Sequence, residues 1–76
     1  MFHGEQKVTI YTPFIKLDSL LKLSGLCMTG GEAKILIAEE EVLLNGEICT
    51  QRGRKITPGD RIECRGQSIV VTQDAP

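Results

Sequence analysis

The dipeptide Asn45-Gly46 constrains the fold of this chain more than any other short stretch. A two-residue type I′ turn needs positive φ at both central positions, and Asn followed by Gly adopts that geometry at low cost. The apolar segments VLL (42–44) and EIC (47–49) flank the dipeptide. They are therefore predicted to pair as an antiparallel hairpin, and the fold has to include a sheet.

Further turn and strand signals follow this hairpin. TPGD, residues 57–60, places proline and glycine where a type II turn requires them. RIECR (61–65) and SIVVT (68–72) are predicted to form a final hairpin around Gly66-Gln67. The last residues, QDAP (73–76), are expected to fray. The C-terminal half of the chain is thus predicted to consist of antiparallel strands.

The N-terminal part begins as a short strand and then changes to a helical period. KVTIYT (7–12) alternates with β-branched residues, and Pro13 ends it. Core-type residues then recur at i, i+3, i+4 and i+7, and Gly25 supplies the left-handed residue that commonly ends a helix. A helix is therefore predicted near residues 16–24. Its narrow core face consists of Leu17, Leu20, Leu21 and Ser24.

A second helix is predicted within CMTGGEAKILIAEEE, residues 27–41. Thr29 and Glu32 have capping-box spacing, in which each side chain satisfies the other residue's backbone N–H. Three acids, Glu39–Glu41, crowd the negative pole of the macrodipole at about 0.3–1 kcal/mol each, and no glycine provides a left-handed exit. The local sequence does not explain what stabilises this end. The core face of the helix consists of Ala33, Leu36 and Ile37.

Together these elements predict an α+β fold in which two short helices pack on one face of a small antiparallel sheet. A chain of 76 residues is expected to form a single domain, residues 1–76, with a thin core. Its hydrophobic share of 41% and charged share of 25% are typical of a globular domain and argue against disorder.

Signals for a membrane span, for secretion and for structural disulfides are missing. No apolar run approaches the roughly 18 residues that a membrane span requires, and MFHGEQKV lacks the pattern of a secretion signal. Cys27, Cys49 and Cys64 are odd in number, and their spacing fits neither a disulfide framework nor a CxxC zinc site. They are interpreted as buried, reduced thiols in a cytoplasmic protein.

Residues that would carry catalysis or bind a metal are scarce. The one histidine, His3, stands in an N-terminal segment expected to be mobile, and no serine or cysteine occurs in a nucleophile pattern. The acids Glu39–Glu41 lack the alternating ligand loop of a calcium site, so a solvated helix end is the preferred interpretation. No enzymatic activity, metal or cofactor is therefore expected.

The start of the second helix has some features of an anion site. TGGEAK resembles a fragment of a phosphate loop but lacks the complete G-x-x-x-x-G-K-[ST] pattern. Gly30 and Gly31 present backbone N–H groups that are able to meet a phosphate, although Glu32 supplies negative charge to the same donors. Capping is the preferred interpretation, and anion contact at the two glycines is secondary.

The segment QRGRK, residues 51–55, concentrates positive charge. Three of the nine cations, Arg52, Arg54 and Lys55, fall within four positions although the net charge is −1. If the glycine takes positive φ, successive N–H groups turn inward as an anion-binding nest while both arginines project outward. A solvated loop that only aids solubility explains this composition equally well.

Two lysines on the predicted helices favour the binding interpretation. Lys34 follows Ala33 and Lys22 follows Leu21, about 100° round each helix, so both lysines lie on a helix flank. If the helices pack side by side on the sheet, these lysines share a face with the basic loop. The local field, screened over roughly 8 Å at physiological salt, then decides the partner, and a polyanion is expected to bind despite the negative total.

The order of these elements resembles the alpha-L RNA-binding domain, which is named for a protein of the small ribosomal subunit. The resemblance rests on a helix, GL, a second helix with EAK and LIAE, then V-x-L-N-G and a closing PGD, and it covers residues 15–63. The chain resembles in particular the short stand-alone bacterial members of YbcJ type. The family binds structured RNA through its two helices and the loop after the hairpin. The residues that this implies are Lys22, Thr29, Gly30, Gly31, Lys34, Arg52, Arg54 and Lys55, with Lys16 as a lesser candidate.

The sequence departs from the family pattern at three places. Many relatives begin the second helix with Ser-Arg, where this chain has Gly30-Gly31. Glu40 takes the place of a usual helix-ending glycine, and Leu43 replaces a commonly basic strand residue. The hypothesis is that the RGRK segment compensates for the missing cations.

The resemblance and the residue types together imply recognition of RNA shape and backbone. Arginine forks fit phosphate oxygens bidentately, whereas lysines act as point charges. The basic loop contains no aromatic residue, and Tyr11 and Phe14 are expected to pack beside the first helix, so stacking on splayed bases has little support. A monomer that binds folded or double-stranded RNA, ribosomal or transfer RNA, is expected. Five engaged cations give a log-affinity against log-salt slope of about −4.

A protein–protein adaptor is the alternative function. Leu43 and Ile35 fall off the predicted core faces and are expected to form an exposed apolar patch near the acidic helix end. An RNA shift assay on the Arg52→Glu, Arg54→Glu double variant separates the two functions. An adaptor predicts either unchanged binding by the variant or no binding by the wild type.

Overall fold

The structure of the protein is a computed structural model that describes residues 4–74. His3 and the last two residues of the QDAP segment lie outside the described residues. No helix within the described range is long and apolar enough to cross a membrane.

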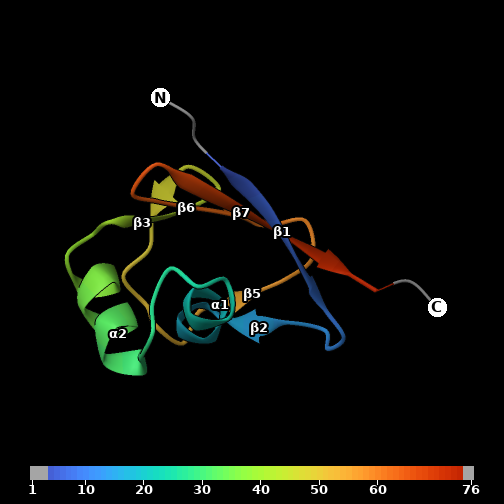
Figure 1. Cartoon of the computed structure of the whole chain (residues 1–76), viewed down its shortest axis with the longest axis horizontal. Helices are drawn as coiled ribbons and strands as arrows, with labels where there is room; N and C mark the ends of the chain where they lie inside the picture. Colours follow the sequence, from blue (N-terminus) through green and yellow to red (C-terminus); the bar gives the residue numbers. More distant parts are fainter. Residues whose placement is uncertain (1–3, 75–76) are drawn as a thin grey trace.

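The larger sheet has five strands in the order β1-β7-β6-β3-β4, and its interior strands run antiparallel (Figure 1). The strands are β1 (Glu5–Ile10), β3 (Val42–Leu44), β4 (Glu47–Ile48), β6 (Arg61–Cys64) and β7 (Gln67–Gln73). The α+β fold class is confirmed, but the sheet is mixed, because β1 pairs with β7 in parallel. A parallel pair at one edge was not expected, since strand patterns do not reveal partners that are distant in sequence.

A second layer lies on one face of this sheet. It contains α1 (Leu17–Leu23), α2 (Gly30–Ala38) and a separate two-stranded sheet of β2 (Ile15–Lys16) and β5 (Lys55–Ile56). Figure 1 shows both helices and the β2–β5 pair on the same side of the five-stranded sheet. The core between the layers is apolar. The predicted core residues of α1 and α2 meet the inward residues of the strands there, and the largest fully buried side chains are Leu17, Leu20, Leu21, Ile37, Val42, Ile56, Ile62, Ile69 and Val71.

Three predicted turns form, one of them shifted by a residue. Asn45 (φ 51°) and Gly46 (φ 89°) have the positive φ of a type I′ turn, and Gly59 (φ 98°) occupies the left-handed position of the TPGD turn. The last hairpin turns at Arg65-Gly66 rather than at Gly66-Gln67. Pairing of β6 with β7 requires this register, because it places both positive-φ residues at the centre of the turn.

The first strand and the C-terminal segment also differ from the prediction. The first strand covers Glu5–Ile10 instead of 7–12, because the backbone bends after Ile10. Tyr11 lies in that bend and is exposed, so it does not pack beside the first helix. Gln73 belongs to β7, and the Asp74 N–H donates to the Ile10 carbonyl, so the described part of QDAP does not fray.

The far end of α2 closes without glycine. Glu40 takes φ 62°, and its N–H donates to the Ile37 carbonyl at 3.1 Å while the Glu41 N–H donates to Leu36 at 3.2 Å. This is the hydrogen-bond pattern of a Schellman motif. The Arg65 Nε donates to Glu41 at 2.9 Å and lowers the pKa of that carboxyl. The two closing hydrogen bonds and the Arg65–Glu41 ion pair therefore stabilise the end that the local sequence left unexplained.

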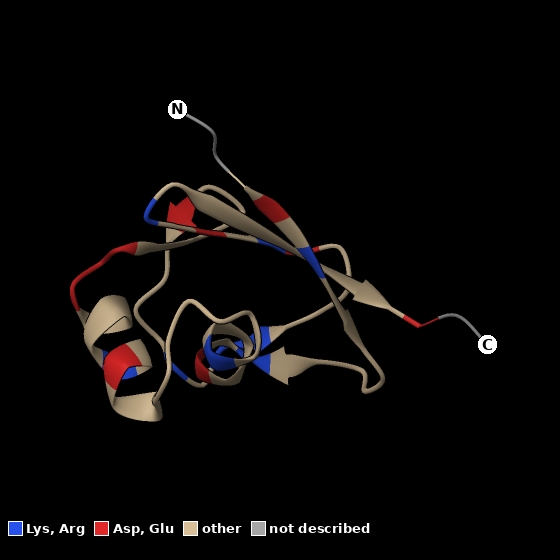
Figure 2. Cartoon of the chain, viewed as in Figure 1, with Lys and Arg blue, Asp and Glu red and all other residues tan. Residues whose placement is uncertain are grey.

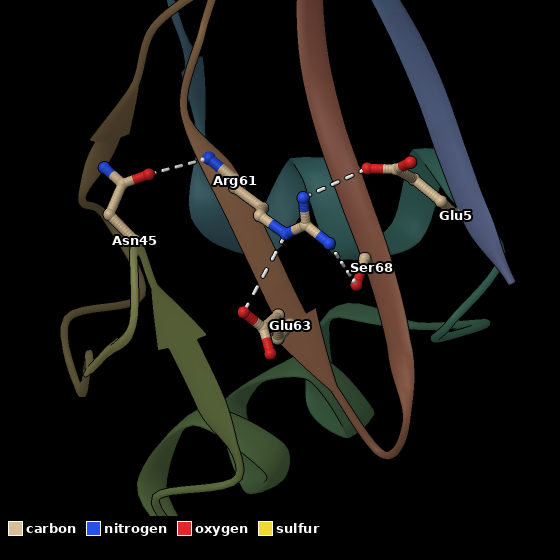
Figure 3. A network of polar contacts seen from close by, with 5 residues as sticks. All are labelled: Glu5, Asn45, Arg61, Glu63 and Ser68. Atoms are coloured by element: carbon tan, nitrogen blue, oxygen red, sulfur yellow. Dashed lines mark hydrogen bonds and ion pairs between the residues drawn. The ribbon is translucent and has the colours of Figure 1, made fainter. Parts of the chain in front are cut away.

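Ion pairs and hydrogen bonds connect the strands on the outer face of the sheet (Figure 3). The Arg61 guanidinium lies 3.2 Å from a Glu5 oxygen and 3.8 Å from Glu63, and it donates to the Ser68 hydroxyl at 3.3 Å. The Arg61 backbone N–H donates to Asn45 Oδ1 at 2.9 Å. Arg61 therefore links β1, β6, β7 and the β3–β4 turn, and its charge is balanced within the sheet.

Candidate nucleic-acid interface

The β2–β5 pair brings two lysines side by side. Lys16 and Lys55 are cross-strand partners, and the neighbouring pair is Ile15 and Ile56. Ile56 is buried and Ile15 packs against the core, so the alternation of side chains along a strand turns the two lysines to solvent. Like charges directly opposite each other destabilise a strand pair. This cost disappears when an anion lies between them.

Lys16 has a second unfavourable position, because it is the N-cap of α1. Its side chain makes no capping hydrogen bond. Ser, Thr, Asp and Asn are the usual N-cap residues, and a cation at this pole opposes the helix dipole. A residue that breaks two local rules is expected at a functional site. These two features make Lys16, the lesser candidate from sequence, a stronger candidate for the site.

The basic loop is seated on the start of α1 through its carbonyl groups. The Leu17 N–H donates to the Arg54 carbonyl at 2.9 Å, and the Asp18 N–H donates to the Arg52 carbonyl at 3.1 Å. The predicted nest is wrong on two other grounds. The Arg54 N–H is used within the loop by the Gln51 carbonyl at 3.1 Å, and Gly53 does not take positive φ. The loop therefore lacks the geometry of a nest, and its side chains are the candidate ligand-binding groups.

One arginine of the loop is partly neutralised. Arg52 Nε lies 3.6 Å from Asp18 Oδ2, and the Arg52 side chain remains 55% exposed. Lys22 stands four residues after Asp18 and so lies on the same side of α1. Lys55 Nζ lies 4.9 Å from the centroid of the Phe14 ring, a cation–π contact. Lys16, Lys55, Arg52, Arg54 and Lys22, called the basic surface from here on, are thus gathered around α1 and the β2–β5 pair.

The charges of the helical layer differ from those of the sheet. Arg61 and Arg65 are paired with acids on the sheet. Within residues 4–74, the cations of the basic surface other than Arg52 make no ion pair. Figure 2 shows the blue segments around α1, β2 and β5 beneath the five-stranded sheet. The predicted convergence of these cations with Lys34 on one binding face stays a prediction.

The start of α2 is capped, and no hydrogen bond or ion pair among the described residues links the RNA-binding residues predicted there to the basic loop. Thr29 Oγ1 accepts from the Glu32 N–H at 3.2 Å, as the predicted capping box requires. The Glu32 carboxylate accepts from the Met28 N–H at 2.8 Å instead of from the Thr29 N–H, so the other half of the box does not form. α1 packs against α2. No hydrogen bond or ion pair among the described residues joins Lys34, Gly30 or Gly31 to the loop, and their place in the interface stays a prediction.

An open hollow of about 310 Å³ lies beside the basic loop. Its lining includes Ile48 of β4, Thr50, Gln51 and Arg54. Of these, only Arg54 was a candidate from sequence. The others carry no motif, and their convergence depends on how the loop folds back past the β3–β4 hairpin.

The cysteines and acids give no sign of a metal centre. Cys27, Cys49 and Cys64 are buried free thiols, and burial raises the pKa of Cys27 and Cys64. No group of His, Cys, Asp and Glu within the described range is placed to hold a metal ion.

Two helices pack on a small sheet, and a basic face lies where the helices meet a short two-stranded ribbon. This arrangement is an alpha-L RNA-binding motif. Residues 8–72 match the S4 domain family, and the chain belongs to that family. The resemblance seen in the sequence is confirmed, and the match is longer than the 15–63 core expected from the motifs. The expectation that the chain is not an enzyme is confirmed by this membership.

Three relatives illustrate the range of the family. The probable ribosome maturation protein RlbA of Bacillus subtilis (strain 168) is 42% identical over 59 residues, which are 78% of this chain and 83% of that protein. The putative RNA-binding protein YbcJ of Escherichia coli (strain K12) is 39% identical over 59 residues, 78% of this chain and 84% of YbcJ. The small ribosomal subunit protein uS4 of Coxiella burnetii (strain CbuG_Q212) is 34% identical over 53 residues, 70% of this chain but only 26% of uS4.

The fold is also that of a solved structure. The solution structure of YbcJ from E. coli, described as revealing an AlfaL motif involved in RNA-binding, superimposes with a TM-score of 0.66 at 32% identity. The match covers 95% of this chain and 90% of that chain.

Proposed function

We propose that this protein binds folded or double-stranded RNA through the basic surface, mainly by contacts to phosphates. The observation that carries the proposal is the Lys16–Lys55 pair, because two exposed like charges face each other across a ribbon only two residues long. A bridging phosphate converts this repulsion into attraction. Arg52 and Arg54 are close to the pair through the loop that is bonded to the start of α1.

The residue types favour recognition of shape and backbone over sequence. Arginine guanidinium groups bind phosphate oxygens bidentately, and the lysines add point charges. Double-stranded RNA hides its base edges in a deep, narrow major groove, so a rigid basic surface meets phosphates and 2′-hydroxyls. Lys34, Gly30 and Gly31 extend the surface along α2 in this proposal. The five cations of the basic surface alone give a salt slope of about −4, and engagement of Lys34 makes it steeper.

The proposed target is ribosomal RNA, and transfer RNA is the competing target. The support is the name of the relative RlbA, a probable ribosome maturation protein, and the similarity to uS4. We also propose that the protein acts in the cytoplasm, because three buried free thiols fit a reducing compartment. Crosslinking in cells followed by sequencing of the attached RNA separates the two targets.

The test compares the Lys16→Gln, Lys55→Gln double variant with Lys7→Gln. Lys7 is an exposed lysine on β1, at the edge of the sheet away from the basic surface, and it makes no ion pair with other described residues. Fluorescence anisotropy with a labelled RNA hairpin, repeated over a salt series, measures the affinity. The double variant is expected to bind more weakly and to reduce the slope by about 2, since each lost phosphate contact removes about 1. Lys7→Gln is expected to match the wild type, and equal behaviour of the two variants refutes the proposal.

The adaptor alternative retains one observation. Ile35 on α2 is 57% exposed, as that function needs. Leu43 is half-buried in β3, which is hydrogen-bonded on both sides by β4 and β6. An adaptor predicts that Ile35→Ser abolishes capture of a protein partner while the Lys16→Gln, Lys55→Gln variant leaves that capture unchanged.

A further inference from the structure

The hollow beside the basic loop has free polar groups on its wall. The side chains of Thr50, Gln51 and Arg54 line it and make no hydrogen bond with other residues of the described chain, whereas the Asn45 amide, also at the hollow, is occupied by Arg61 and Asp60. Free donors and acceptors that converge on a concave surface are the usual means of orienting a small ligand. The Gln51 amide offers one acceptor and two donor hydrogens in a plane.

The hollow also has an apolar surface and a balanced charge. Ile48, at the outer edge of the sheet in β4, lines it and is 55% exposed, an unusual position for a large aliphatic side chain. Glu47 and Arg54 contribute opposite charges to the wall. A phosphate group would meet the Glu47 carboxylate, so a neutral, flat and hydrogen-bonding group fits this hollow better than an anion.

We propose that the hollow holds one nucleobase, from an unpaired nucleotide that protrudes from the bound RNA. The base lies against Ile48, and the Gln51 amide bonds to its edge. This inference rests on the proposed RNA binding and adds a base-reading element that the phosphate contacts do not supply. A volume of about 310 Å³ is at the lower end of the range for small-ligand sites and accommodates a single base.

Arg54 connects the hollow to the basic surface. It lines the hollow, and the next residue, Lys55, forms the lysine pair with Lys16. An RNA strand whose phosphates cross the lysine pair is therefore adjacent to the hollow, and an unpaired nucleotide of that strand reaches it without a second binding event. Fully paired RNA leaves the hollow empty, because its bases are stacked inside the helix.

The experiment uses two RNA hairpins with the same stem, one of which carries a single-nucleotide bulge tested with each of the four bases. Wild-type protein is expected to bind the bulged hairpin with at least one base about tenfold more tightly than the plain hairpin. Gln51→Ala is expected to remove that preference and leave the plain hairpin unchanged, a loss in the range of one bidentate amide contact to a base. The substitution keeps the Gln51 backbone carbonyl that accepts from the Arg54 N–H.

Gln6→Ala is the matched control. Gln6 is an exposed glutamine on β1, at the opposite edge of the sheet from β4. This variant is expected to retain the full preference for the bulge. A second readout places 2-aminopurine at the bulge, and its fluorescence is expected to change on binding to the wild type and much less with Gln51→Ala.

The outcomes separate the two proposals. Equal wild-type affinity for both hairpins, or an undiminished preference in Gln51→Ala, overturns the base site while RNA binding stands. If the Lys16→Gln, Lys55→Gln variant binds both hairpins with the affinity of the wild type, the phosphate-binding proposal is overturned instead.

Discussion

Replacing Glu40 by glycine is expected to stabilise the protein, and the end of α2 allows the size of the effect to be worked out. Glu40 has φ 62°, a conformation that costs an L-residue about 1–2 kcal/mol. Glycine removes this cost but loses about 0.5–1 kcal/mol more backbone entropy on folding. Removing an acid from the negative pole of the helix returns about 0.3–1 kcal/mol. The net expectation is a gain of about 1 kcal/mol.

Urea unfolding followed by far-UV circular dichroism measures the gain, and a thermal melt is expected to rise by about 4–8 °C for a domain of this size. Glu40→Gln is the control, because it removes the charge and keeps the Cβ atom. Its gain is expected to be limited to the charge contribution. The two hydrogen bonds that close the helix are made by backbone groups and persist in both variants. If Glu40→Gly is no more stable than Glu40→Gln, the left-handed glutamate is not a strained position and the reasoning fails.

Two further predictions concern charge. Asp18→Asn is expected to raise RNA affinity about two- to fivefold in an anisotropy assay, because it releases Arg52 from an exposed ion pair. The Asn oxygen can still accept from the Ser19 N–H, so the start of the helix keeps that hydrogen bond. Unchanged affinity would show that Arg52 does not contact RNA. Burial tends to raise the pKa of Asp60, but hydrogen bonds from Thr57 and Asn45 outweigh it and hold that pKa below its usual value. The stabilisation from Asp60 is therefore complete above the unfolded-state pKa of about 3.9 and is lost as pH falls through the lower folded value. At pH values below about 4, the urea midpoint of the wild type is expected to fall, and that of Asp60→Asn is expected to depend less on pH. Parallel curves of urea midpoint against pH for the two proteins would contradict the assignment.

Local chemistry accounts for what the sequence could predict. Asn45-Gly46, Gly25 and Gly59 adopt left-handed conformations because glycine has no Cβ atom and asparagine tolerates positive φ, and this choice does not depend on the rest of the fold. Thr29 caps α2 for the same kind of reason. Turns and helix starts were therefore predictable to within a residue or two.

Contacts between distant segments account for what could not be predicted. β2 and β5 have two residues each, which is too short for a periodic signal, and they pair across about half of the chain. The proposed role of Lys16 rests on that pairing and on its N-cap position, neither of which a pattern shows. The orientation of the basic loop was equally hidden. The N–H groups at the start of α1 decide it, because they take the Arg52 and Arg54 carbonyls as acceptors. The nest is excluded separately, because the Arg54 N–H bonds to the Gln51 carbonyl and Gly53 does not take positive φ.

A net charge of −1 is compatible with polyanion binding because the two layers use their charges differently. On the outer face of the sheet, Arg61 is balanced by Glu5 and Glu63, so that face presents little field beyond a Debye length of roughly 8 Å. Lys16 and Lys55 lie in the other layer, where no acid pairs with either of them among the described residues. We therefore expect a polyanion to be attracted mainly to the helical layer. On the proposed function, the same distribution that keeps the total near zero would also orient the domain on its ligand.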